Sequence, residues 1–122
     1  MTDFNLKHIQ EAANYGKLSN HPDYKHGAIL IIKNTPYYAY NRFRTHPKSP
    51  KPYKTMCAEF GAVIASRADL KAFRKAKLYV ARLKKNGTLG MSKPCIWCQE
   101  MITKLGIKRV FYSTDKGYES LY

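Results

Sequence analysis

Two short stretches, CAE (residues 57–59) and PCIWC (residues 94–98), contain all three cysteines of the chain. Each stands at the predicted start of a helix, and helix starts favour thiolate over thiol. Three thiolates suit Zn²⁺, and three protein ligands leave a fourth position for water. Cys95 and Cys98 are three residues apart and therefore share one helix face. The pattern predicts one zinc centre between two helix starts, with Cys57, Cys95 and Cys98 as ligands.

Glu59 is two residues from a predicted ligand, so it lies near the metal and need not bind it. A carboxylate in this place can take a proton from the water of a catalytic zinc site. The alternative is a purely structural zinc, which needs a fourth protein ligand such as His26 or His46. In that case Glu59 is only an acid favoured by the helix dipole.

The stretches on either side of these helices alternate between helical and strand patterns. GAILII (27–32) is an unbroken apolar run and predicts a strand that is buried on both faces. The predicted elements are a helix from a cap at Thr2 and Asp3 to about Tyr15, strands 27–32 and 37–41, a loop 42–56, a helix 57–70, a strand 77–83, a loop 84–93, a helix 94–105 and a strand 108–113. This order predicts an α/β layered domain with a mixed sheet, as one domain over residues 1–122.

Composition excludes several other classes of protein. Of 122 residues, 44% are hydrophobic, which argues against disorder, and no run is long enough to span a membrane. The N-terminus lacks the pattern of a secretory signal, and three cysteines do not form a disulfide framework, so a cytoplasmic location is expected. The net charge of +14 has two explanations, a phosphate-bearing partner or compositional drift towards lysine, of which there are 16 against 6 arginines. The surplus sits in two acid-free segments, 24–58 and 70–99.

The two stretches together form the motif Cys-x-Glu followed by Pro-Cys-x-x-Cys. This motif matches the three-cysteine variant of the signature of zinc deaminases. The sequence resembles the cytidine deaminase superfamily over about residues 18–118. That superfamily includes cytidine, deoxycytidylate, tRNA-adenosine and polynucleotide cytidine deaminases. HGAILIIKN (26–34) resembles its first hairpin strand, and RVFYSTDKGYES (109–120) resembles the strand and loop that close its pocket. The resemblance implies a three-layer fold with helices on both faces of the mixed sheet.

The resemblance also implies roles for single residues. Glu59 would move protons between water, the ring nitrogen and the leaving ammonia. The backbone N–H of Ala58 would contact the base carbonyl, the backbone C=O of Ser92 the amino group, and Asn41 the sugar or base. The remaining expected substrate contacts are Pro94, His46, Phe43 and Tyr112, whereas Trp97 is expected to be buried packing.

Eight cations occupy the loops before the two metal motifs, and we expect them to flank the mouth of the pocket: Arg42, Arg44, Lys48, Lys51, Lys54, Lys84, Lys85 and Lys93. The predicted activity is therefore hydrolytic deamination of cytosine to uracil in a phosphate-bearing substrate, either a nucleotide such as dCMP or single-stranded nucleic acid. No membrane partner is expected, and a homo-oligomer is left open. The alternatives are adenosine-to-inosine deamination in tRNA and a non-catalytic, zinc-stabilised nucleic-acid-binding module.

Overall fold

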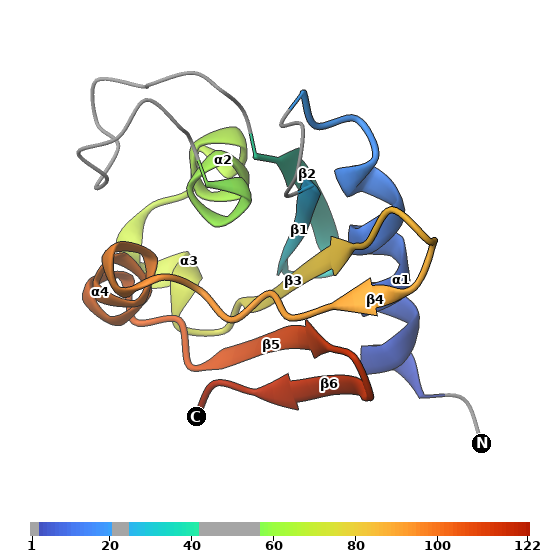
Figure 1. Cartoon of the computed structure of the whole chain (residues 1–122). Coiled ribbons are helices and arrows are strands. Elements are labelled where there is room, and N and C mark those ends of the chain that lie inside the picture. The colour runs from blue at the N-terminus through green and yellow to red at the C-terminus, as the bar shows by residue number, and fades with distance from the viewer. Residues whose placement is uncertain (1–2, 21–24, 42–56) are drawn as a thin grey trace.

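Ten helices and strands make up the part of the chain described by the computed structural model, which covers residues 3–20, 25–41 and 57–122 (Figure 1). In chain order they are α1 (Phe4–Gly16), β1 (Lys25–Ile32), β2 (Thr35–Tyr40), α2 (Ala58–Ser66), α3 (Leu70–Phe73), β3 (Lys77–Leu83), β4 (Leu89–Gly90), α4 (Ile96–Leu105), β5 (Arg109–Thr114) and β6 (Gly117–Ser120).

All six strands belong to one sheet with the order β2-β1-β3-β5-β6, and the short β4 pairs with β3 beside this path. β3 and β5 run parallel, and α4 lies in the crossover that connects them. Every other pairing is antiparallel. The mixed sheet predicted from the element order is confirmed.

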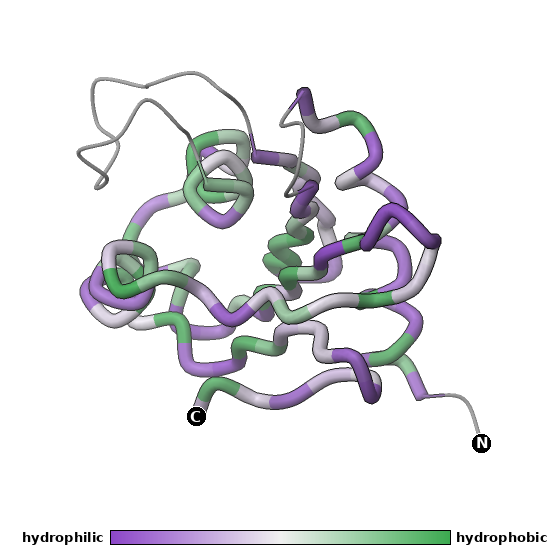
Figure 2. Tube along the Cα trace, in the orientation of Figure 1, coloured by the Kyte–Doolittle hydropathy of each residue, from purple (hydrophilic) through white to green (hydrophobic). Residues whose placement is uncertain are grey.

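Helices cover both faces of the sheet, as Figure 1 shows with α1 on one side and α2, α3 and α4 on the other. A hydrophobic core lies on each face of the sheet, and β1 contributes to both, as expected of a strand buried on both faces. Ala28, Leu30 and Ile32 pack in the larger core with α2 and α4, whereas Ile29 packs against α1. Figure 2 shows this strand as an apolar segment in the middle of the molecule. The three-layer α/β architecture is confirmed.

α1 approaches β1 so closely that two glycines meet at the contact. A Cβ atom added to Gly27 would lie 1.8 Å from the carbonyl oxygen of Ala12, and one added to Gly16 would lie 2.8 Å from the backbone nitrogen of Gly27. Only glycine allows backbones to pack at this distance. Asp3 begins the helix as predicted, because its side chain accepts a hydrogen bond of 3.1 Å from the backbone N–H of Leu6.

The helix predicted over residues 57–70 is wrong at its end. α2 stops at Ser66, where Arg67 adopts a left-handed conformation with φ of 49°. The Ser66 hydroxyl donates to the carbonyl of Val63 at 2.7 Å, and Asp69 then caps the separate helix α3. Serine and aspartate compete for backbone hydrogen bonds in this way and so interrupt a helix.

The other differences concern turns and short strands. β2 begins at Thr35 rather than at residue 37, because Lys33 and Asn34 both have positive φ and form a two-residue hairpin turn. The sequence pattern also did not predict β4, within the expected loop 84–93, or β6. The expected loop 42–56 lies outside the described residues. None of the helices in the described part combines the length and apolar character required to cross a bilayer.

Candidate active site

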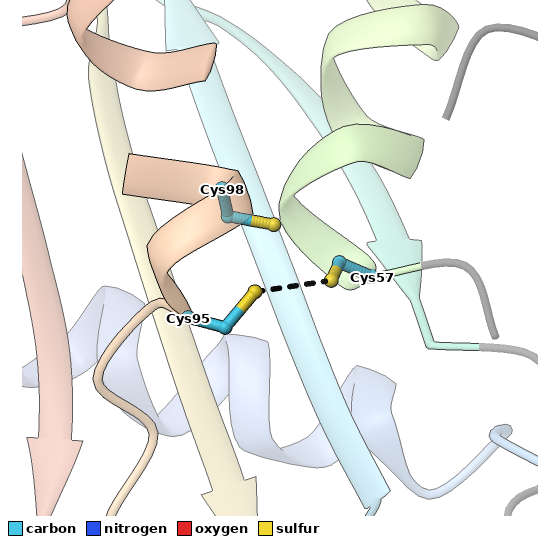
Figure 3. Close-up of side chains that lie close together, drawn as sticks. All are labelled: Cys57, Cys95 and Cys98. Atoms are coloured by element: carbon cyan, nitrogen blue, oxygen red, sulfur yellow. Dashed lines mark hydrogen bonds between the residues drawn. The ribbon is translucent and has the colours of Figure 1, made fainter. Parts of the chain in front are cut away.

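The three cysteines come together between the N-termini of α2 and α4. Cys57 is the residue that precedes α2, Cys95 is the residue that precedes α4, and Cys98 lies in the first turn of α4. Figure 3 shows the three side chains pointing toward one another, with the Sγ atoms of Cys57 and Cys95 4.0 Å apart. All three sulfur atoms lie within 4.8 Å of one another, and all three cysteines are free thiols.

This geometry fits a zinc ion. Zn–S bonds of about 2.3 Å in a tetrahedral site place the sulfur atoms about 3.8 Å apart, close to the spacing of this cluster. Within the described residues, no histidine or carboxylate joins the three cysteines as a fourth ligand. Catalytic zinc sites have three protein ligands, whereas structural ones have four. His46, one candidate for a fourth ligand, lies outside the described residues.

The pKa values of the thiols show how strongly they interact. The hydrogen bond with Cys95 is the largest cause that raises the pKa of Cys57 to about 12. The contact with Cys98 opposes this shift, while burial and the charge of Glu59 add to it. The pKa of Cys98 is also raised, first by its contact with Cys57. A divalent cation deprotonates the thiols that it binds, so zinc uptake by this cluster is expected to release protons.

Glu59 is buried in the first turn of α2, with 5% of its surface exposed. Its charge contributes to the raised pKa values of Cys57 and Cys98, and its role in proton transfer stays a prediction. Ala58 is fully buried in the same turn. The first N–H groups of a helix have no partner within the helix, so the Ala58 N–H is suited to a ligand carbonyl.

Asn41 follows β2 and is held against the start of β1. Its side-chain oxygen accepts a hydrogen bond of 2.9 Å from the His26 N–H, and its backbone N–H donates to the His26 carbonyl at 3.1 Å. The Ser19 hydroxyl donates to the carbonyl of Asn41 at 2.8 Å. These bonds fix the end of β2, where the resemblance predicts a substrate contact.

Ser92 is buried in the segment between β4 and α4, where a network of serine hydrogen bonds holds it. Its hydroxyl donates to the carbonyl of Val80 at 2.8 Å, and its backbone N–H donates to the carbonyl of Ser113 at 3.0 Å. The backbone N–H of Ser113 donates to Ser92 Oγ at 2.8 Å. Ser113 Oγ donates to the carbonyl of Gly90 at 2.6 Å and accepts from the Arg82 N–H at 2.9 Å.

Ser113 was not predicted as a site residue. A hydroxyl in the middle of a buried strand pattern is the signal in the sequence that could have found it, because a buried polar group needs partners. The structure shows these partners in the segment that leads to Cys95.

The structure places other predicted residues as follows. Pro94 is buried directly before Cys95, and its carbonyl accepts a hydrogen bond of 2.7 Å from the Gln99 side chain. Tyr112 is in the large core and donates a hydrogen bond of 2.9 Å to Glu119, a position that favours packing over stacking on a base. Trp97 is 36% exposed, so the expectation that it is buried is wrong: it points away from the core side of α4 that carries Cys98 and Ile102. His46 and Phe43 lie outside the described residues.

Of the eight expected rim cations, three are described. Lys84 and Lys85 are exposed in the turn that joins β3 to β4, and Lys93 is exposed in the segment before Cys95. Arg42, Arg44, Lys48, Lys51 and Lys54 lie outside the described residues. The rim of cations therefore stays a prediction.

The sequence model of the family described as "Cytidine and deoxycytidylate deaminase zinc-binding region" matches residues 3–114. The chain belongs to this family. Its zinc-binding region is the one that contains the cysteine cluster, so the expected zinc cofactor and the assignment to zinc-dependent deaminases agree with both the family and the geometry. No curated protein matches the chain.

Solved structures of similar fold include three from this group of enzymes. Cytidine deaminase from Burkholderia pseudomallei is 18% identical with a TM-score of 0.67, and 98% of this chain and 91% of that chain are covered. Cytidine deaminase from Mycobacterium leprae is 21% identical with a TM-score of 0.60, and the coverage is 97% and 94%. The dCMP deaminase from the cyanophage S-TIM5, in complex with dCMP and dUMP, is 20% identical with a TM-score of 0.63, and the coverage is 92% and 82%. These likenesses show the cytidine-deaminase fold.

Proposed function

We propose that this family member catalyses the zinc-dependent hydrolytic deamination of a cytosine base to uracil in a phosphate-bearing nucleotide. The observation that carries the proposal is the buried Glu59, two residues after Cys57, beside a three-thiol cluster with no fourth protein ligand among the described residues. The net charge of +14 supports a substrate with phosphate. So does the similarity to a cyanophage enzyme that binds dCMP and dUMP.

Cys57, Cys95 and Cys98 would hold the metal. A bound zinc ion supplies Lewis acidity that activates water for hydrolysis at neutral pH. Glu59 accepts a proton from the attacking water and passes it to the ring nitrogen beside the amino-bearing carbon. Glu59 then takes the second proton of that water, from the hydroxyl now bonded to the carbon, and delivers it to the amino group. The C–N bond breaks, ammonia leaves, and the oxygen becomes the new carbonyl. One water is consumed for each ammonia released.

The remaining groups orient the base. The Ala58 N–H would bind the base carbonyl from the first turn of α2, and the Ser92 carbonyl would accept from the exocyclic amino group. The serine network holds the Ser92 backbone on β3 and β5, so this acceptor does not need to reorganise when the base binds. Asn41 would donate to the sugar from the end of β2.

Replacement of Glu59 by glutamine tests the proton-transfer role. Glu59→Gln keeps the size of the side chain but removes the carboxylate, so turnover should fall by at least about a hundredfold. The zinc content should stay at one per chain. Glu100→Gln, at an exposed carboxylate on α4, is the matched control and should keep wild-type activity. Wild-type turnover in Glu59→Gln would contradict the mechanism.

A panel of substrates tests which base reacts and whether it belongs to a nucleoside, a nucleotide or a nucleic acid. Cytidine, deoxycytidine, CMP, dCMP, single-stranded DNA and tRNA are incubated with the zinc-loaded protein, and the products are measured by mass spectrometry. Formation of uracil in a monophosphate at a higher kcat/KM than in its nucleoside supports the proposal. Inosine in tRNA as the only product would assign the chain to adenosine deamination, and no product from any substrate would favour the non-catalytic module.

A further inference from the structure

A second concentration of positive charge lies away from the cysteine cluster, around α3 and the C-terminal end of α4. We call it the α3–α4 basic patch, and it consists of Arg67, Lys71, Arg74, Lys75, Lys104 and Lys108. All six residues are exposed. In the two sequence segments that contain them, residues 67–75 and 104–108, the only carboxylate is Asp69, whose side chain caps α3.

Two observations place α3 beside the end of α4, and Figure 1 shows the two helices as neighbours. A groove of about 710 Å³ is lined by Arg67 and Lys71 together with Leu105 of α4. The side chain of Arg74 lies 3.8 Å from the place that a Cβ atom of Gly106 would occupy. Lys104 and Lys108 flank this glycine in the sequence.

Asp69, the one carboxylate in these two segments, accepts a hydrogen bond from the Ala72 N–H and so caps α3. The exposure of the patch and the spread of its charges over two elements do not suit a single phosphate group, which needs donors that converge. They suit a polyanion, whose charges repeat along a chain.

An exposed aromatic side chain lies beside the patch. Tyr122 is 64% exposed, and its hydroxyl lies 3.3 Å from Thr103 Oγ1, next to Lys104. Cations that follow a phosphate backbone, with an aromatic ring for an unpaired base, are characteristic of surfaces that bind single-stranded nucleic acid. The adjacent groove is lined in part by apolar residues, including Val63 and Leu70, and bases that pack on them would bury apolar surface.

We infer that the α3–α4 basic patch binds the backbone of single-stranded nucleic acid, with Tyr122 stacking on a base. The patch is separated from the predicted zinc ligands by the length of α4, because Leu105 follows Cys95 by ten residues and a helix rises about 1.5 Å per residue. The inference does not rest on the proposed deamination, since a strand bound here need not contain the base that reacts.

A fluorescein-labelled 15-mer of thymidine tests the inference, because it has no amino-bearing base to deaminate. Its binding to the zinc-loaded full chain is measured by fluorescence anisotropy between 50 and 300 mM salt. Arg74→Glu/Lys104→Glu should weaken binding at least tenfold at low salt. It should also lower the slope of log K against log salt by at least about 1.4, because each phosphate contact on a single strand contributes about 0.7.

The control has the same net charge. Lys7→Glu/Lys17→Glu reverses two exposed cations on and just after α1 and should change the affinity less than threefold. An equal loss in both variants would show that the affinity follows total charge, and would overturn the inference. So would displacement of the strand by saturating dCMP, since it would place the strand in the pocket. Circular dichroism confirms that both variants fold.

Tyr122 provides an arm that does not change charge. Tyr122→Leu should lower the affinity for the thymidine 15-mer at least fivefold. Tyr122→Phe keeps the aromatic ring and should bind the 15-mer as the wild type does. Vesicles that contain phosphatidylserine are the comparison anion. If they bind as tightly as the strand and lose affinity equally in Tyr122→Leu, the surface does not select nucleic acid and the inference fails. Turnover of dCMP should be unchanged in every variant, so this test is separate from that of the proposed function.

Discussion

The two faces of the sheet are built on opposite principles. On the α1 face, backbones pack against each other through Gly16 and Gly27, and the core is completed by apolar and aromatic side chains. On the α2 and α4 face, the starts of two helices bring three thiols together, and a buried carboxylate lies in the first turn of α2. The first face therefore packs backbone against backbone, whereas the second gathers titratable side chains.

This difference predicts that changes on the two faces have different consequences. A change at the thiol cluster should abolish turnover while the protein still folds. A change at the glycine contact should lower the free energy of unfolding, while the molecules that remain folded keep their turnover. The following variants test this separation, from the largest expected effect to the smallest.

Cys98→Ser should abolish the function of the face that carries α2 and α4. Loss of one of three thiolates removes zinc, and the several kcal/mol that a metal contributes to catalysis correspond to about a thousandfold in turnover. Zinc is measured with a chromogenic chelator and turnover with the best substrate of the panel. Retention of one zinc per chain in this variant would contradict the assignment of the ligands.

Gly27→Ala should have the largest effect on stability. The added methyl group would lie 1.8 Å from the Ala12 carbonyl oxygen, so α1 has to move away from β1, at a cost of about 3 kcal/mol or more. Gly90→Ala is the control, because its Cβ atom would meet only flexible parts of the Lys84 and Arg82 side chains at 3.2–3.4 Å. Unfolding in urea measures both variants. Equal midpoints would show that the close contact of α1 with β1 is not required.

Ser113→Ala tests the connection between the sheet and the active site. It removes the hydroxyl that accepts from the Arg82 N–H and donates to the Gly90 carbonyl, which should cost about 1–3 kcal/mol. Because the segment 90–95 loses an anchor, kcat should fall more than KM rises, and the affinity for zinc should also fall. Ser120→Ala, at an exposed hydroxyl on β6, should behave as the wild type does. A loss of stability with unchanged kcat and zinc affinity would show that Ser113 serves the fold alone.

Asp3→Ala should have the smallest effect, and the effect depends on pH. The hydrogen bond from the Leu6 N–H lowers the pKa of the Asp3 carboxyl in the folded state. A lowered folded pKa means that the ionised cap stabilises α1 above the unfolded pKa of about 4, and that this contribution is lost as the pH falls through the folded value. The difference in urea midpoint between wild type and variant should therefore be present at pH 7 and shrink at pH 3. A difference that grows in acid would contradict this role.

Local patterns were sufficient to predict most of the fold. The apolar run of β1, the cap at Asp3, and the proline and glycine around α4 each specify structure over a few residues. The same is true of the metal cluster, because Cys95 and Cys98 lie on one helix and the signature joins them to Cys57.

What could not be predicted depends on interactions between distant segments or between competing local ones. β6 is short, and its pairing with β5 stabilises it. The end of α2 depends on whether Ser66 and Asp69 bind the backbone, which competes with an otherwise helical pattern. Ser113 has its role only because residues 90 and 92 return to the same edge of β5.

The separation of Cys57 from Cys95 by 38 residues has a consequence for folding. Neither metal motif supplies three ligands alone, so a complete site exists only when the starts of α2 and α4 lie side by side. Contacts between segments so far apart in the sequence require a long loop to close, which lowers the rate of folding. Zinc held by all three thiols would bind the folded chain better than the unfolded one, so removal of the metal should lower the free energy of unfolding.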